Sequence, residues 1–153
     1  MKIVDLLNPN AIAADIEASG KDEALVELTD VMMQVESGLD RDEVIRVLKE
    51  REKLGSTGIG DGVAIPHGKL RNMKKLQRSF GRSRRGVDFD SMDDKPAHLF
   101  FLLIAPEESV GVHLKTLARI SKLLKNPDVR RRLVEADGSR ELYRIIAEEE
   151  EKL

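Results

Sequence analysis

The 153-residue sequence contains no cysteine, and this absence excludes disulfides, thiolate nucleophiles and thiolate metal ligands. It also favours a reducing compartment. The longest apolar run, Leu99 to Ala105, is far shorter than the roughly 20 residues that cross a bilayer. The first residues, Met1 to Asp5, lack the apolar segment of a secretory signal peptide. We therefore expect a cytoplasmic protein that does not insert into membranes.

Aromatic residues are scarce, at 3% of the chain, and the formal net charge is -2. Both values argue against a nucleic-acid partner, which needs positive charge and stacking surfaces. Basic residues do gather in one stretch between Asp61 and Asp88, where no acidic residue occurs: Lys69, Arg71, Lys74, Lys75, Arg78, Arg82, Arg84 and Arg85. This stretch is either a solvated edge or a positive rim that attracts a phosphorylated or acidic partner.

The balance of 41% hydrophobic and 35% charged residues is typical of a globular protein. We expect one domain over residues 1–153, because the sequence contains no linker, repeat or low-complexity segment. Apolar residues at helical spacing predict helices over 21–36, from Asp40 onward, over 110–125, after Asn126-Pro127, and from Ser139 onward. Asp40 should cap its helix, with Glu43 reaching back as in a capping box.

Three segments are predicted strands: 63–65, 80–84 and, most strongly, 97–104, whose continuous apolar run indicates burial on both faces. The glycine-dense residues 55–62 are expected to form a loop. Since strands and helices intermix, we predict an α/β fold with helices on both faces of a sheet. The acidic residues 148–151 should form a frayed, solvated helix end.

Arg51 lies on the apolar face of the helix that begins at Asp40, since it follows Val44 by seven residues and Leu48 by three. That face normally packs against the protein, so a cation there is unusual. In the 110–125 helix the expected apolar positions are Leu114, Leu117, Ala118, Leu123 and Leu124.

His67 is the first candidate for chemistry, because it follows a short strand and Pro66, between the glycine-rich loop and Gly68. A residue beyond a strand end commonly faces a crevice, and nearby glycines let backbone N–H groups approach an anion. An imidazole there can act as nucleophile, base or metal ligand. The alternative is that Pro-His-Gly is merely a turn.

His113 precedes Leu117 by four residues and Ile120 by seven, so it lies on the apolar face of its helix, near the N-terminal end. It is either a satisfied core histidine or a residue that meets an anion at a helix start. His98 opens the strongest strand without glycine or acidic neighbours, and we expect it to be structural.

Common catalytic motifs are absent from the sequence. Histidine pairs at metal-binding spacing do not occur, and the chain lacks the P-loop, the dinucleotide fingerprint and the GxSxG hydrolase motif. We therefore expect no metal and no cofactor.

The segment from Arg51 through Gly55-Ser56-Thr57-Gly58-Ile59-Gly60 to Pro66-His67-Gly68 resembles the signature of the enzyme IIA domains of the phosphoenolpyruvate-dependent phosphotransferase system, of the fructose/mannitol type. The resemblance continues through these stretches: 81–83, 86–90, 101–106 and 113–120. It implies an α/β sandwich with a mixed sheet. The isolated enzyme IIA unit and the stretches at 81–83 and 86–90 favour the nitrogen-related branch.

Three residues acquire roles from this resemblance. His67 stands where the family accepts a phosphoryl group from an HPr-type phosphocarrier protein. His113 and Arg51 stand where the family's second histidine and arginine help to hold that group. The implied partners are the phosphocarrier and a downstream IIB or regulatory target protein.

Three functions remain open at this point. The first is a regulatory phosphocarrier whose phosphorylation switches its binding to other proteins. The second is a sugar-transport component that passes the phosphoryl group to a IIB partner. The third is a binding module that uses the fold without phosphorylation.

Overall fold

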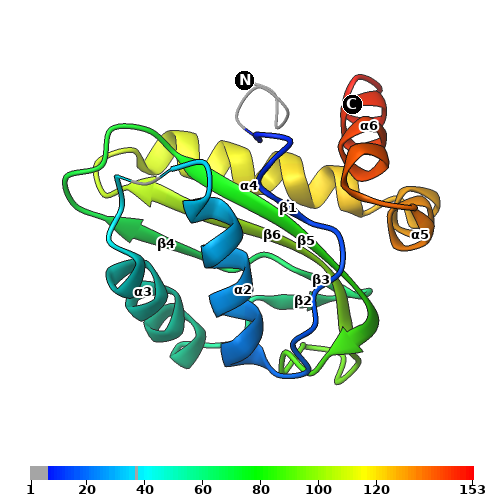
Figure 1. Cartoon of the computed structure of the whole chain (residues 1–153), viewed down its shortest axis with the longest axis horizontal. Helices are drawn as coiled ribbons and strands as arrows, with labels where there is room; N and C mark the ends of the chain where they lie inside the picture. The colour runs from blue at the N-terminus through cyan, green and yellow to red at the C-terminus, as the bar shows by residue number, and fades with distance from the viewer. Residues whose placement is uncertain (1–6, 37) are drawn as a thin grey trace.

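A six-stranded mixed sheet forms the middle layer of the computed structural model, which describes residues 7–36 and 38–153 (Figure 1). The strands are β1 (Ile12–Ala13), β2 (Gly58–Gly60), β3 (Val63–Ala64), β4 (His67–Leu70), β5 (Gln77–Val87) and β6 (Ala97–Pro106). Their order is β1-β5-β6-β3-β2, with β4 also paired to β6. The β1–β5, β3–β6 and β4–β6 pairs are parallel, whereas β2–β3 and β5–β6 are antiparallel. The mixed sheet is as the resemblance implied.

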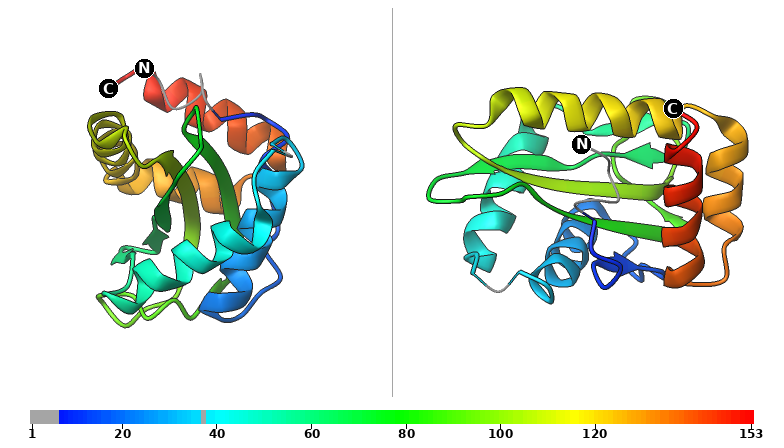
Figure 2. Two further views of the ribbon diagram at one scale, coloured as in Figure 1. Left: turned by 90° about the vertical axis from the view of Figure 1, so that its left-hand side faces the viewer. Right: turned by 90° about the horizontal axis from the view of Figure 1, so that it is seen from above.

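Helices cover both faces of this sheet, which confirms the predicted fold class. One face carries α2 (Lys21–Met33) and α3 (Arg41–Lys53), and α4 (Val110–Leu124) lies on the opposite side (Figure 2). The cluster on the α4 side also includes residues of α5 (Pro127–Glu135) and α6 (Ser139–Glu150). The first predicted helix is shorter than expected: it was predicted to reach position 36, and α2 ends at Met33. No helix in the described ranges combines the length and apolarity needed to cross a bilayer.

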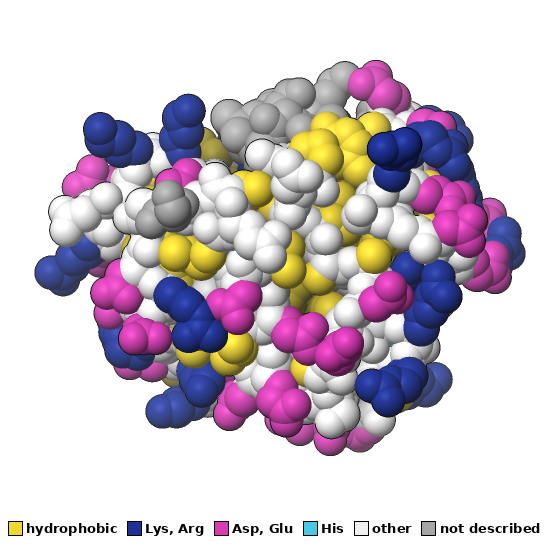
Figure 3. All heavy atoms as spheres, viewed as in Figure 1, with side chains coloured by type: hydrophobic (Ala, Val, Ile, Leu, Met, Phe, Trp, Pro, Cys, Tyr) yellow, Lys and Arg dark blue, Asp and Glu magenta, His cyan; other side chains and the backbone are white. Residues whose placement is uncertain are grey.

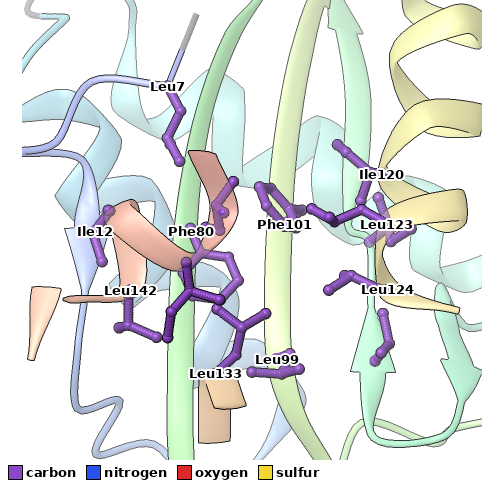
Figure 4. Packing of buried hydrophobic residues seen from close by; sticks show 14 of the residues in the cluster. Leu7, Ile12, Phe80, Leu99, Phe101, Ile120, Leu123, Leu124, Leu133 and Leu142 are labelled. Atoms are coloured by element: carbon purple, nitrogen blue, oxygen red, sulfur yellow. The ribbon is translucent and has the colours of Figure 1, made fainter. Parts of the chain in front are cut away.

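Strand β6 is the centre of both hydrophobic clusters, as its apolar run predicted. Since side chains alternate along a strand, Leu99 and Phe101 face the cluster shared with α4, α5 and α6, whereas Phe100 and Leu102 face α2 and α3. In the first cluster the Phe80 and Phe101 rings lie 4.8 Å apart (Figure 4). Burial of these large side chains supplies the main stabilisation of the fold.

Two predicted helix starts are confirmed by their caps. The Asp40 carboxylate accepts hydrogen bonds from the N–H groups of Asp42 and Glu43, at 3.1 and 3.3 Å. The Asn126 side chain accepts from the Asp128 N–H at 2.9 Å, with Pro127 in the first turn. The capping box is only half present, because the described bonds of the Glu43 carboxylate go to Arg46.

The glycine-dense segment and the weak strand at 80–84 contain more strand than expected. Gly58–Gly60 forms β2, which pairs with β3 through an irregular register, so this part of the segment is not a loop. Strand β5 spans eleven residues. Gln77 to Arg82 pair with β6 in a regular register, and Val87 pairs with Ala97 after an irregularity. Neither extension carries a simple alternating pattern in the sequence.

The acidic end of the last helix is solvated only in part: Glu148 and Glu151 are exposed, as expected, but Glu149 is half-buried and Glu150 is buried. Glu150 is 1% exposed, and its carboxylate accepts a hydrogen bond from Arg119 Nε at 2.5 Å. Glu149 pairs with Arg132, also at 2.5 Å. Cations from α4 and α5 therefore anchor the end of α6 to the rest of the protein.

The apolar face of α4 is also narrower than predicted. Leu123 and Leu124 are buried and Leu117 is half-buried, but Leu114 is 59% exposed and Ala118 is exposed. The buried stripe runs instead through His113 and Ile120. Two expected core positions of this helix therefore face outward.

The basic stretch is not a continuous positive rim. Arg78 and Arg82 are buried in β5, at 2% and 0% exposure, and Arg84 donates to the Ala136 carbonyl. The face that carries α2 and α3 shows acidic and basic side chains interspersed (Figure 3). Only part of the stretch is therefore available to a charged partner.

Candidate functional site

His67 owes its position to a break between two strands. Strands β3 and β4 pair with successive parts of the same edge of β6, and Ile65 and Pro66 lie between them. The backbone stays bonded across the break, since the Ile65 N–H donates to the Thr57 carbonyl and Pro66 accepts from the Leu103 N–H, both at 3.0 Å. His67 therefore begins β4 on a fixed backbone.

The His67 ring has one nitrogen committed to the backbone. Its Nδ1 lies 2.7 Å from the Ile65 carbonyl oxygen, two residues earlier. A carbonyl only accepts hydrogen bonds, so Nδ1 carries the proton and Nε2 has the lone pair in the neutral ring. The strand break thus fixes the tautomer and leaves Nε2 as the basic nitrogen.

His113 lies beside His67 although 46 positions separate them in the sequence. The two ring centroids are 5.4 Å apart, with the ring planes at 52°. His113 is 3% exposed, and its Nδ1 has no hydrogen-bond partner among the described residues. It is buried, as a core histidine would be, but it is not satisfied. A buried unsatisfied polar atom costs free energy unless a ligand or water completes it.

Arg51, at the end of α3, completes the predicted group. Its Nη1 donates to the Gly55 carbonyl at 2.9 Å, which holds the guanidinium over the start of the glycine-dense segment. All three predicted residues line one pocket of about 570 Å³. The other lining residues are Val47, Glu50, Leu54, Gly68, Lys69, Leu114 and Leu117.

Glu52 anchors the segment that follows Arg51. Its carboxylate is buried and accepts from the Thr57 N–H at 3.0 Å and from the Thr57 hydroxyl. Lys21 Nζ lies 3.1 Å from the same carboxylate. No sequence pattern indicated this role, because the Glu52–Thr57 contact depends on the turn between α3 and β2.

Gly68 allows α3 to pack closely against β4. A Cβ added there would lie 3.0 Å from the Val47 Cγ2 atom, at the edge of what real contacts show. Val47 is one helical turn before Arg51, and Gly68 directly follows His67. The missing side chain therefore brings the arginine-bearing helix close to the histidine-bearing strand.

Both site histidines are neutral near pH 7. Burial lowers the pKa of His67, and the charges of Arg51 and Lys69 act in the same direction, while the Ile65 carbonyl and Glu52 oppose them. Burial, followed by the charges of His67 and Lys69, lowers the pKa of His113 to about 4. A neutral imidazole beside cations suits attack on an electrophile that carries negative charge.

The remaining histidine lies outside this site. His98 is half-buried, and its Nδ1 lies 2.8 Å from the Ser83 carbonyl oxygen, in keeping with the expected structural role. Within the described ranges, no group of three or more potential metal ligands comes together. Lys69 is a further cation of the pocket that the sequence reasoning left in the basic stretch without a role. Its spacing of two from His67 in a strand is the signal that would have identified it.

Three comparisons bear on this geometry. The family model for the phosphoenolpyruvate-dependent sugar phosphotransferase system, EIIA 2, matches residues 5–149. A nitrogen regulatory protein of Bradyrhizobium diazoefficiens is 42% identical over 147 residues, which cover 96% of this chain and 95% of that protein. The crystal structure of nitrogen regulatory protein IIA-Ntr from Neisseria meningitidis has a TM-score of 0.87 at 35% identity, covering 94% of this chain and 98% of that one.

One further relative is a much longer protein. The PTS system fructose-specific EIIABC component of Bacillus subtilis is 38% identical over 146 residues. These residues cover 95% of this chain but only 23% of that protein.

Proposed function

The chain belongs to the EIIA 2 family of the phosphoenolpyruvate-dependent sugar phosphotransferase system, and from this membership we propose that it is a phosphohistidine carrier that accepts a phosphoryl group on His67. The observation that carries the proposal is the bond between His67 Nδ1 and the Ile65 carbonyl. It leaves Nε2 unprotonated and nucleophilic beside Arg51 and His113.

The proposed step moves a PO₃⁻ unit from the phosphohistidine of an HPr-type carrier to this chain. The bond between Nε2 of His67 and phosphorus forms as the carrier's nitrogen–phosphorus bond breaks, and the electron pair of that bond returns to the carrier nitrogen. The Nδ1 proton stays on His67, where the Ile65 carbonyl accepts its hydrogen bond. Catalysis is then mainly positioning and electrostatic stabilisation of the outer oxygens.

Arg51 and His113 are proposed to stabilise that charge. Arg51 provides a permanent cation, with Gly55 accepting one of its five N–H groups. His113 provides a nitrogen that lacks a partner among the described residues. Because a bound phosphoryl group favours the protonated or donor form of a neighbouring imidazole, His113 is proposed to donate to it after transfer. Backbone N–H groups near Gly68 are candidates for further donors.

Phosphorylation by the cognate carrier tests the proposal. The protein is incubated with phosphoenolpyruvate, enzyme I and the HPr-type carrier, and its intact mass is measured. We expect an acid-labile gain of one phosphoryl group that is lost in His67→Gln. The matched control is His98→Gln, because His98 also holds a backbone carbonyl through Nδ1. Equal phosphorylation of wild type and His67→Gln would refute the assignment.

Of the possible recipients, we propose a regulatory target protein. The support is that nitrogen regulatory proteins are matched over 91% or more of their own length, whereas a fructose-specific EIIA component is matched over 83% of its length. The fructose-specific relative favours the alternative, a sugar-transport component that passes the group to a IIB partner. Loss of the phosphoryl group from the labelled protein on addition of a IIB protein would favour transport. If no phosphorylation occurs with the cognate carrier, the third function, a binding module, stands instead.

A further inference from the structure

Lys69 lies on the same side of β4 as His67. The two residues are two positions apart in the strand, so their side chains point to the same face, about 7 Å apart along it. Both line the pocket that also holds His113 and Arg51. A lysine side chain is long enough to bring its ammonium group over a group attached to the His67 ring.

Lys69 also lacks the partners that neighbouring cations have. Arg71 pairs with Glu107 at 3.2 Å, whereas no ion pair of Lys69 occurs among the described residues. The carboxylate that lines the pocket belongs to Glu50, which pairs with Arg46 at 2.9 Å. The pocket therefore has two cations, Arg51 and Lys69, without a neutralising carboxylate. A site arranged in this way is suited to a dianionic group.

We propose that Lys69 is a third phosphoryl-binding residue, whose ammonium group contacts the phosphoryl oxygens on His67 during and after transfer. This inference rests on the proposed function of His67. It differs from a docking role, in which Lys69 would contact the surface of the phosphocarrier protein and not the transferred group.

The electrostatics of the pocket support this position. The Lys69 charge lowers the pKa of both His67 and His113, as expected of a cation that faces both rings. Arg51 and Glu52 also act on His67 from α3 and the turn after it, in opposite directions. Removing the Lys69 charge should therefore raise the pKa of both histidines.

A small phosphoryl donor separates contact with the phosphoryl group from contact with the carrier. Phosphoramidate transfers its PO₃⁻ unit to imidazole nitrogen, and its own nitrogen leaves as ammonia with the electron pair of the broken bond. We expect Lys69→Gln to slow phosphorylation of His67 by about tenfold with phosphoramidate and with the HPr-type carrier alike. The effect is smaller than for a buried donor because Lys69 is exposed. Lys69→Arg should restore most of the rate.

Arg71→Gln is the matched control, because it removes the same charge from a residue of the same segment that lies outside the His67 pocket. It should leave both rates unchanged. NMR titration of the unphosphorylated proteins should show higher pKa values for His67 and His113 in Lys69→Gln, and not in Arg71→Gln.

Three results would overturn the inference. Slowing only with the protein carrier would assign Lys69 to docking, and equal effects of Lys69→Gln and Arg71→Gln would reduce it to general surface charge. Unchanged rates of Lys69→Gln with both donors would show that Lys69 has no role in phosphoryl transfer. Failure of the proposed function looks different, since wild type would then react with phosphoramidate but not with the carrier.

Discussion

Cations in two regions of this protein have opposite surroundings. Arg82, in the middle of β5, is fully buried, and its guanidinium donates to the carbonyls of Ala14, Leu133, Val134 and Ala136 at 2.7 to 3.0 Å. Lys69 and Arg51 line an open pocket, and among the described residues neither has a carboxylate partner. Residues of the same charge therefore bind the protein's own backbone in one region and line an open pocket in the other.

The difference lies in what surrounds the charge. Around Arg82 the backbone supplies acceptors at the C-terminal end of α5, where the helix dipole also favours a cation. The pocket supplies few acceptors to Arg51 and Lys69, so their free N–H groups remain for a ligand. A positive stretch in a sequence thus contains cations whose N–H groups the protein already binds and cations whose N–H groups stay free, and the nearby acceptors distinguish the two kinds.

The largest effect that would test this comparison is on stability, at Arg82. Arg82→Ala removes four hydrogen bonds from a charged group and leaves a cavity, so we expect the free energy of unfolding to fall by about 4 kcal/mol. Urea denaturation measures the change. Arg84→Ala is the control, since Arg84 donates to the same Ala136 carbonyl from a half-exposed position and should cost about 1 kcal/mol. Equal losses would contradict a special role for the buried guanidinium.

A second test concerns the buried imidazole of the pocket. The pKa of His113 is about 4 in the folded protein and about 6.5 in the unfolded chain. Between these values the unfolded state binds more protons, so stability falls as the pH decreases from 6.5 to 4. We expect His113 to account for about 3 kcal/mol of that loss. The measurement is denaturation over this pH range, with His113→Phe as the comparison. Parallel pH profiles for the two proteins would show that His113 titrates normally.

The third test should affect transfer and leave the fold intact. Arg51→Ala removes a candidate donor to the phosphoryl group, and we expect phosphorylation by the carrier to slow about 100-fold, or about 2.7 kcal/mol. Stability should change little, because Arg51 makes one described hydrogen bond, to Gly55. Single-turnover phosphorylation and urea denaturation give the two values. A large loss of stability without a change in rate would mean that Arg51, like Arg82, is a structural cation.

The smallest effect should come from a solvated ion pair outside both regions. Arg71 and Glu107 pair at 3.2 Å with exposed side chains, so Arg71→Ala should change the free energy of unfolding by less than about 0.5 kcal/mol. Denaturation at low and high salt checks this. A loss above 1 kcal/mol would mean that exposed cations also support the fold.

Most elements of the fold were predictable, because their signals are local. Asp40 and Asn126 at helix starts and the apolar run of β6 act within a few residues. The length of β5, the strand β2 and the burial of Glu150 depend on partners far away in the sequence. No local pattern contains that information.

The candidate site was predictable in its residues but not in its geometry. His67, His113 and Arg51 came from motif resemblance and helical spacing, and the structure brings them around one pocket. The carbonyl that fixes the His67 tautomer is only two residues away, but the bond depends on the break at Pro66. Lys69 was left among its basic neighbours because β4, the strand that places it on the same face as His67, was not predicted from the sequence.

The packing at Gly68 makes the spacing of the site depend on a single absent methyl group. With 3.0 Å between a hypothetical Cβ and Val47 Cγ2, even alanine would require Val47 on α3 to give way by a few tenths of an ångström. Such a shift would change how far the Arg51 guanidinium reaches toward the His67 ring, while the core beneath remained intact. Relatives that differ at this glycine are therefore expected to differ in transfer rate before they differ in melting temperature, so the position acts as a fine adjustment of reactivity.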